Sequence, residues 1–126
     1  MNCKLTDFGA SRNINLLMTN MTFTKGIGTP AYMAPEILDQ KKYKKSADIY
    51  SFAITMYEVF NWKQAYSTKE FKFPWKIAEF VASGNRLKRL DSMIEEQYSV
   101  IQQCWEQEPN DRLTIKEVIT QLEKLN

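Results

Sequence analysis

The sequence contains no histidine and only two cysteines, Cys3 and Cys104, in 126 residues. Without histidine, neither a Ser-His nor a Cys-His catalytic pair can form. Two isolated cysteines also cannot supply the usual zinc site, which takes four Cys or His ligands. We therefore expect both cysteines to be buried thiols in a reducing compartment, with a disulfide as the alternative.

Neither sign of charge dominates, because 17 Lys and Arg residues oppose 15 Asp and Glu residues and leave a net charge of +2. This balance gives no support for nucleic acid or an acidic membrane surface as the main partner. The local run of lysines at 41, 42, 44 and 45 is interpreted as a solvated loop before a helix.

Long apolar runs are also missing. The longest, from Ile49 to Phe60, is interrupted by Ser51, Thr55 and Glu58, and it is too short and too polar to span a bilayer. The first residues lead into no apolar segment of the signal-peptide type. We therefore expect a cytoplasmic protein with no membrane partner.

The residues that are present predict a mostly helical chain with an irregular N-terminal quarter. Residues 11–28 are rich in Thr, Asn and Lys without a sustained period, which is typical of a loop, and residues 3–5 could end a strand. Five helices are predicted: Pro35–Leu38, Ser46 (as N-cap) to Phe60, Pro74 to about Gly84, about Ser92 to Glu106, and Thr114 (as N-cap) to Leu122. In the last of these, Thr114 and Glu117 form a capping box. The second has apolar side chains around nearly its whole circumference, which is typical of a helix inside a domain.

Four sequence strings carry most of the functional information. Asp7-Phe8-Gly9 alone is weak, because Asp and Gly also favour turns. Residues 28–36, Gly-Thr-Pro-Ala-Tyr-Met-Ala-Pro-Glu, are far more specific, since six of their positions match a fixed template. Two further strings follow in order: Asp48-Ile49-Tyr50-Ser51-Phe52, and Cys104-Trp105 with Pro109 and Arg112.

On these strings the chain is identified as a member of the eukaryotic protein kinases, and it resembles their C-terminal lobe from just before Asp-Phe-Gly onward. The resemblance covers residues 1–126 and implies a mainly α fold of about five helices without the N-terminal lobe. Residues 1–36 would run to the end of the activation segment, and residues 37–126 would form the rest of the helical lobe. The wording of residues 28–36 is most similar to the tyrosine-kinase-like group. We therefore expect transfer of the γ-phosphoryl group of ATP to Ser or Thr of protein substrates, with Tyr as the less favoured acceptor.

The resemblance also implies roles for individual residues. Asp7 would ligate the Mg²⁺ that bridges the ATP phosphates, as part of a cofactor-binding motif with Phe8 and Gly9. Thr29 would hydrogen-bond the catalytic base. Asp48 would cap backbone amides of the catalytic loop.

Two predictions concern the ends of the activation segment and the hydroxyl groups within it. Glu36 would form a buried ion pair with Arg112, and the alternative is two independent surface charges. The loop offers four candidate phosphorylation sites, first Thr22 and Thr24 and then Ser11 and Thr19. The alternative is that these hydroxyl groups only make the loop polar.

The sequence departs from the kinase pattern in several places. Ala53 stands where the family usually has Gly, and Asn85-Arg86-Leu87 replaces a common Gly-x-Arg-Pro. The chain contains no glycine-rich loop, strand lysine, partner glutamate or His-Arg-Asp catalytic loop, and it starts six residues before Asp7. We therefore expect a portion of a kinase whose partner is the missing N-terminal part. It should be inactive alone and should expose an apolar face of the helix at Ile49 to Phe60. The alternative is a catalytically dead scaffold or protein-binding module.

Overall fold

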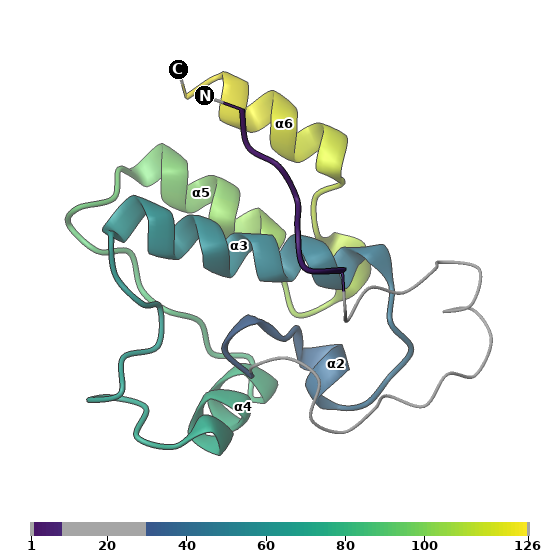
Figure 1. Ribbon diagram of the computed structural model, residues 1–126, viewed down its shortest axis with the longest axis vertical. Helices are drawn as coiled ribbons and strands as arrows, with labels where there is room; N and C mark the ends of the chain where they lie inside the picture. The colour runs from purple at the N-terminus through teal and green to yellow at the C-terminus, as the bar shows by residue number, and fades with distance from the viewer. Residues whose placement is uncertain (1, 9–29, 126) are drawn as a thin grey trace.

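A computed structural model of the protein describes residues 2–8 and 30–125 (Figure 1). The described residues form five α-helices: α2 (Pro35–Leu38), α3 (Lys45–Asn61), α4 (Pro74–Ala82), α5 (Glu95–Cys104) and α6 (Ile115–Glu123). Two short 3₁₀ turns, η2 (Pro30–Tyr32) and η3 (Pro109–Asp111), complete the regular structure, and these ranges contain no strand. The predicted mainly α fold is confirmed.

Helix α3 is the centre of the helical body. It runs beside α5, α6 packs on α5, and α4 packs against η2 and α2 below this pair in Figure 1. The largest side chains that are completely buried come from several of these elements: Tyr50, Ile54, Val81, Met93, Ile101, Cys104 and Val118. One continuous apolar core therefore connects the helices from α2 to α6.

Only part of the circumference of α3 is buried. Tyr50, Ala53 and Ile54 have no exposed surface, whereas Phe52 is 37% exposed and Val59 is 55% exposed. These two residues lie seven positions apart, on the same side of the helix. The core therefore buries the apolar residues on one side of α3. The residues on the other side form the exposed apolar face that was expected.

Two predicted helix starts are wrong, and a long-range hydrogen bond of the side chain accounts for one of them. Helix α3 starts after Lys44, so Ser46 lies inside the first turn, where its carbonyl oxygen accepts a hydrogen bond from Arg112. Helix α5 starts only after Ile94, and Ser92 instead donates a hydrogen bond to the side chain of Asn61 at the end of α3. Only the Ser92 bond uses the hydroxyl, whereas the bond to Ser46 uses its backbone carbonyl and does not involve its side chain.

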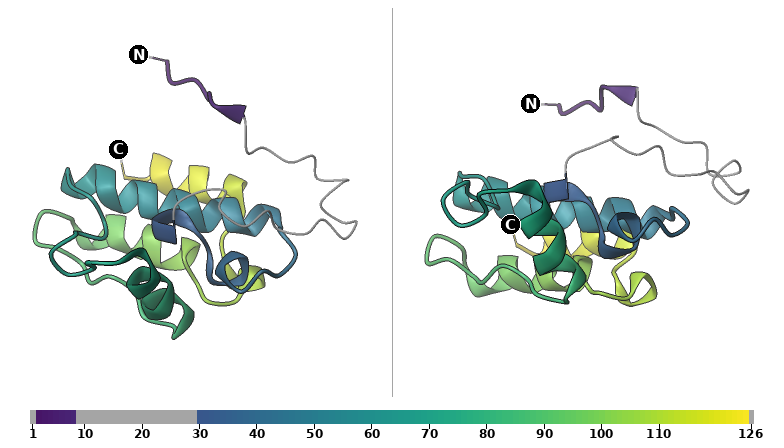
Figure 2. Two further views of the ribbon diagram at one scale, coloured as in Figure 1. Left: turned by 60° about the horizontal axis from the view of Figure 1, so that its bottom comes forward. Right: turned by 90° about the horizontal axis from the view of Figure 1, so that it is seen from below.

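Residues 2–8 are exposed and lie apart from the helices in both views of Figure 2. The possible strand over residues 3–5 is absent, because a strand needs a neighbouring strand and the described ranges contain none. Cys3 is exposed, so the expectation that both thiols are buried is wrong for this residue. It is correct for Cys104, and both cysteines are free thiols.

The two thiols should differ strongly in reactivity. Burial raises the pKa of the Cys104 thiol to about 12, so the reactive thiolate is scarce at pH 8. We expect iodoacetamide to label Cys3 within minutes in the native protein and Cys104 only after urea unfolding. Peptide mass spectrometry measures both, and equal labelling of the two thiols before unfolding would contradict the packing around Cys104.

Helix α6 begins with the predicted capping box. The Thr114 side chain accepts from the Glu117 backbone N–H at 3.3 Å, and the Glu117 carboxylate accepts from the Thr114 backbone N–H at 2.7 Å. This backbone bond, with a second bond from the Thr114 hydroxyl, holds the pKa of Glu117 below its ordinary value of 4.5. The box therefore contains one interaction that depends on pH.

We expect Thr114→Ala to lower the free energy of unfolding by about 1 kcal/mol, because the Glu117 backbone N–H loses its acceptor and the Glu117 carboxylate loses one of its two donors. Because the pKa of Glu117 is lower in the folded state, its charge stabilises the fold above pH 4.5, and this contribution is lost as the pH falls through the lowered pKa. Glu117→Gln keeps an acceptor but removes the charge, so its stability deficit should shrink on acidification. Urea unfolding at several pH values tests this, and a deficit that grows toward low pH would refute it.

Among the helices that the structure describes, none is long and apolar enough to cross a membrane.

Candidate functional site

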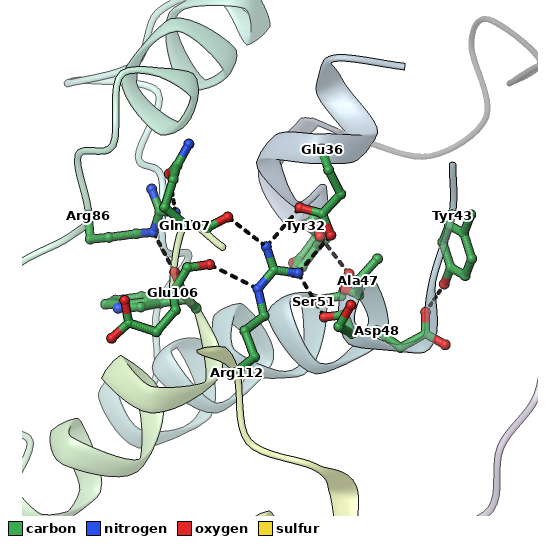
Figure 3. A network of polar contacts seen from close by, with 12 residues as sticks. Tyr32, Glu36, Tyr43, Ala47, Asp48, Ser51, Arg86, Glu106, Gln107 and Arg112 are labelled. Carbon is green, nitrogen blue, oxygen red and sulfur yellow. Dashed lines mark hydrogen bonds and ion pairs between the residues drawn. The ribbon is translucent and has the colours of Figure 1, made fainter. Parts of the chain in front are cut away.

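The most highly connected polar group in the described chain is the guanidinium of Arg112. It lies 76 positions from Glu36 in sequence, yet Nη1 and Nη2 each donate to one oxygen of the Glu36 carboxylate at 2.7 Å (Figure 3). Both residues are buried, with 6% and 8% of their surface exposed. A paired fork of this kind fixes the orientation of both groups as well as their separation.

Arg112 also donates to three backbone carbonyls. Its Nε bonds to Glu106 at 2.9 Å, and its Nη groups bond to Ser46 at 2.9 Å and Gln107 at 3.4 Å. Counting Glu36, all five N–H donors of the guanidinium have an acceptor. One side chain therefore joins α2, the first turn of α3 and the segment between α5 and η3.

A second arginine, Arg86, extends this network. The guanidinium carbons of Arg86 and Arg112 both lie 5.2 Å from the ring centroid of Tyr50, within cation–π range. Arg86 donates to the carbonyl oxygens of Trp105 and Val81 and to the side chain of Gln107. Sequence reasoning counted Arg86 within a departure from Gly-x-Arg-Pro, although Gly84-Asn85-Arg86 keeps the first three positions and only Leu87 departs. That match, and a cation beside a helix C-terminus, are the signals that could have found it.

A third set of contacts ties η2 to α3. The Tyr32 hydroxyl donates to one oxygen of Glu58 at 2.7 Å, and the other Glu58 oxygen accepts from the backbone N–H of Ala65 at 3.0 Å. The hydroxyl of Ser51 donates to the Tyr32 carbonyl at 2.6 Å. The hydrogen bond to Glu58 raises the pKa of Tyr32, because it stabilises the protonated phenol. The segment that precedes α2 is thus held at both its side chain and its backbone.

The amino-acid sequence of the chain matches a known family. The sequence model described as "Protein tyrosine and serine/threonine kinase" matches residues 1–122. The chain belongs to the protein kinase family. The membership expected from its four strings is therefore confirmed.

Individual kinases that resemble the chain come from distant organisms. RGS domain-containing serine/threonine-protein kinase A of Dictyostelium discoideum is 33% identical over 122 residues, which are 97% of this chain and 10% of that protein. A probable LIM domain-containing serine/threonine-protein kinase of the same organism is 32% identical over 123 residues, covering 98% of this chain and 12% of that protein. Serine/threonine-protein kinase VIK of Arabidopsis thaliana is 29% identical over 125 residues, 97% of this chain and 28% of that protein. The chain thus spans a small part of the kinases that it matches.

Within this kinase lobe, Asp48 lies at the exposed start of α3. Its carboxylate accepts a hydrogen bond from the Tyr43 hydroxyl and lies in the first turn, where the helix dipole favours negative charge (Figure 3). Its expected role as a cap for amides of a catalytic loop stays a prediction.

Asp7, in contrast to Asp48, lies in the exposed N-terminal segment. It has a left-handed backbone with φ of 61°, which Asp tolerates better than most residues. A carboxylate is the oxygen ligand that Mg²⁺ prefers, so Asp7 fits the ion as one ligand. Residues 2–8 and 30–125 contain no group of three or more His, Cys, Asp or Glu side chains arranged for a metal. Phe8 is also exposed, at 66%.

The remaining predicted site residues lie outside the described residues: Gly9, Ser11, Thr19, Thr22, Thr24 and Thr29. The structure thus brings Glu36 and Arg112 together and leaves Asp7 without a described partner from the predicted site. Sequence reasoning missed Tyr32, Glu58 and Arg86 as members of the network.

Proposed function

We propose that these residues are the C-terminal part of a kinase that transfers the γ-phosphoryl group of ATP to serine and threonine side chains of protein substrates. The observation that carries the proposal is the buried Glu36–Arg112 pair, which joins the end of the Met-Ala-Pro-Glu string to the last part of the lobe. The serine/threonine kinases among the similar proteins favour these acceptors over tyrosine. The wording of residues 28–36 favours the tyrosine-kinase-like group within the family.

In this proposal, residues 1–36 contain the activation segment and residues 37–126 are the rest of the helical lobe. Asp7, with Phe8 and Gly9, contributes to the ATP site as one ligand of Mg²⁺, and the ion neutralises phosphate charge during transfer. Thr29 contacts the catalytic base. Phosphorylation of Thr22 or Thr24, or of Ser11 or Thr19, orders the segment by adding charge that basic side chains can pair with. Asp48 and the Glu36–Arg112 pair act as structural anchors.

A longer natural polypeptide that contains these residues is the proper test. Incubated with radiolabelled ATP, Mg²⁺ and a generic protein substrate, it should yield phosphoserine or phosphothreonine on amino-acid analysis. Asp7→Asn should abolish the label. The control Asp39→Asn makes the same change at an exposed carboxylate three residues after Glu36, and it should keep the label. Phosphotyrosine alone, or labelling unaffected by Asp7→Asn, would refute the proposal. Absence of label in both the unchanged polypeptide and Asp39→Asn would favour the alternative function, a catalytically dead scaffold.

The 126-residue chain by itself should transfer no measurable phosphoryl group. Its sequence supplies one candidate metal ligand but no glycine-rich loop, strand lysine or His-Arg-Asp string. Phosphoryl transfer depends almost entirely on positioning and charge stabilisation, which one carboxylate cannot provide. The same radiolabel assay measures this, with an active kinase as the positive control. Phosphorylation that disappears in Asp7→Asn of the 126-residue chain would prove the prediction wrong.

A further inference from the structure

An exposed aromatic pair lies at the start of α4, outside the network described above. The rings of Phe73 and Trp75 stack with centroids 4.4 Å apart and planes 5° from parallel. Phe73 is 40% exposed and Trp75 is 56% exposed. Large aromatic surfaces of this kind are enriched in protein interfaces and uncommon on other surfaces.

The pair rests on a firmly packed base. Phe71, two residues earlier and half-buried, makes edge-to-face contacts with Tyr66 and Phe80 at centroid distances of 5.1 and 5.2 Å. These contacts fix the chain two residues before Phe73, and α4, at the bottom of Figure 1, begins directly after it. The stacked rings therefore lie between the packed Phe71 and the first turn of α4.

The surface around the two rings is basic. Residues 69–76 contain three lysines against one glutamate, a net charge of +2 that equals the excess of the whole chain. The Nζ atom of Lys72 lies 5.7 Å from the centroid of Phe73, and Lys69 and Lys76 are exposed within four residues of it in sequence. Lys76 pairs with Glu79 at 3.2 Å, but this pair is exposed and therefore weak. Helix α4 also begins here without a capping side chain, so the positive end of its dipole has the same sign as the lysines.

The groove next to α2 does not share this positive charge. It has a volume of about 580 Å³ and carries both signs, because Asp39 pairs with Lys41 and Glu79 pairs with Lys76. We define the basic aromatic surface as Lys69, Lys72, Phe73, Trp75 and Lys76. Its positive charge, rather than the mixed charge of the groove, complements an acidic partner.

We propose that the basic aromatic surface binds an acidic protein segment that places an apolar side chain against the Phe73–Trp75 stack. The lysines supply the charge complementarity, and the rings supply the apolar area that such an anchor buries. This interaction does not require phosphoryl transfer, so its failure would leave the proposed kinase function untouched.

The test uses the 126-residue chain and fluorescent peptides measured by anisotropy. A peptide with a central Leu-Phe-Leu flanked by glutamates should bind, more weakly as salt increases, and the same peptide flanked by lysines should not. Trp75→Ala and Lys72→Glu should each weaken binding by about tenfold or more. The matched controls Trp62→Ala and Lys116→Glu change exposed residues of the same types elsewhere and should leave the affinity unchanged.

Several results would overturn the proposal. These are equal binding of the two peptides, no binding of the glutamate peptide, or equal losses in Trp62→Ala and Trp75→Ala. A single-stranded oligonucleotide that binds in preference to the acidic peptide would make nucleic acid the occupant, and a dimer that Trp75→Ala dissolves would make it a second copy of the chain. Circular dichroism checks each variant, and Lys72→Glu decides the outcome if Trp75→Ala does not fold.

Discussion

Replacing Arg112 with leucine is expected to lower the free energy of unfolding by about 3–5 kcal/mol, because the Glu36 carboxylate stays buried without its partner. The change also leaves the carbonyl oxygens of Ser46, Glu106 and Gln107 without a donor. Small domains are stable by only about 5–15 kcal/mol, so the variant would lose a large part of its stability. Urea unfolding followed by circular dichroism measures the loss.

Two further variants separate charge from geometry. Arg112→Lys keeps the positive charge but cannot form the two parallel bonds to Glu36, so we expect a substantial loss that is smaller than that of Arg112→Leu. Glu36→Leu combined with Arg112→Leu removes the unpaired carboxylate. It should recover part of the loss and not all of it, because the three carbonyl oxygens still lack their donor.

The matched control is an ion pair of the same chemistry on the surface. Lys76→Ala breaks the exposed bridge to Glu79 and should change stability by less than about 1 kcal/mol. If Arg112→Leu costs no more than Lys76→Ala, the buried pair does not hold the lobe together.

Much of the fold follows from local sequence signals. Pro35 and Pro74 each stand at the first position of a helix, as their fixed φ angle predicts, and the Thr114 capping box marks the start of α6. The predicted bounds of α2 agree with the structure at both ends. These features depend on residues within one turn of each other, so the sequence displays them directly.

The errors arise where tertiary contacts, or their absence, decide the outcome. The Ser92 hydroxyl bonds to Asn61, and the backbone carbonyl of Ser46 accepts from Arg112, and both partners are remote in sequence. Cys3 was expected to be buried because cysteines usually are, but residues 2–8 pack against no described element. Local propensity cannot anticipate these outcomes.

In the site, too, local sequence signals do not reveal contacts between residues that are distant in sequence. The pairing of Glu36 with Arg112 was anticipated only through the kinase resemblance, since nothing local links residues 76 positions apart. Tyr32 and Glu58 were not recognised, because a tyrosine near a glutamate in space leaves no mark in sequence. Tyr50 lies within cation–π range of two guanidinium groups, a contact that only the folded positions of Arg86 and Arg112 reveal.

The second large effect concerns Trp105, which closes α5 at the point where three segments meet. Its ring centroid lies 5.8 Å from that of Tyr57 on α3 and 6.0 Å from that of Tyr98 on α5. Both tyrosine hydroxyls donate to the segment that follows α4, to the carbonyl oxygens of Lys88 and Leu87. Trp105 thus packs between the rings that fix this segment to both helices.

We expect Trp105→Ala to lower the free energy of unfolding by about 3–5 kcal/mol, because only 3% of the side chain is exposed and its removal leaves a cavity between two tyrosines. Trp105→Phe keeps an aromatic contact and should lose clearly less. Trp62→Ala makes the same chemical change at a residue that is 92% exposed, and it should alter stability by less than about 0.5 kcal/mol. Urea unfolding of the three variants under one set of conditions gives the comparison. Because Trp62 and Trp105 both end a helix, a similar loss in the two alanine variants would mean that helix termination, and not burial between Tyr57 and Tyr98, determines the effect.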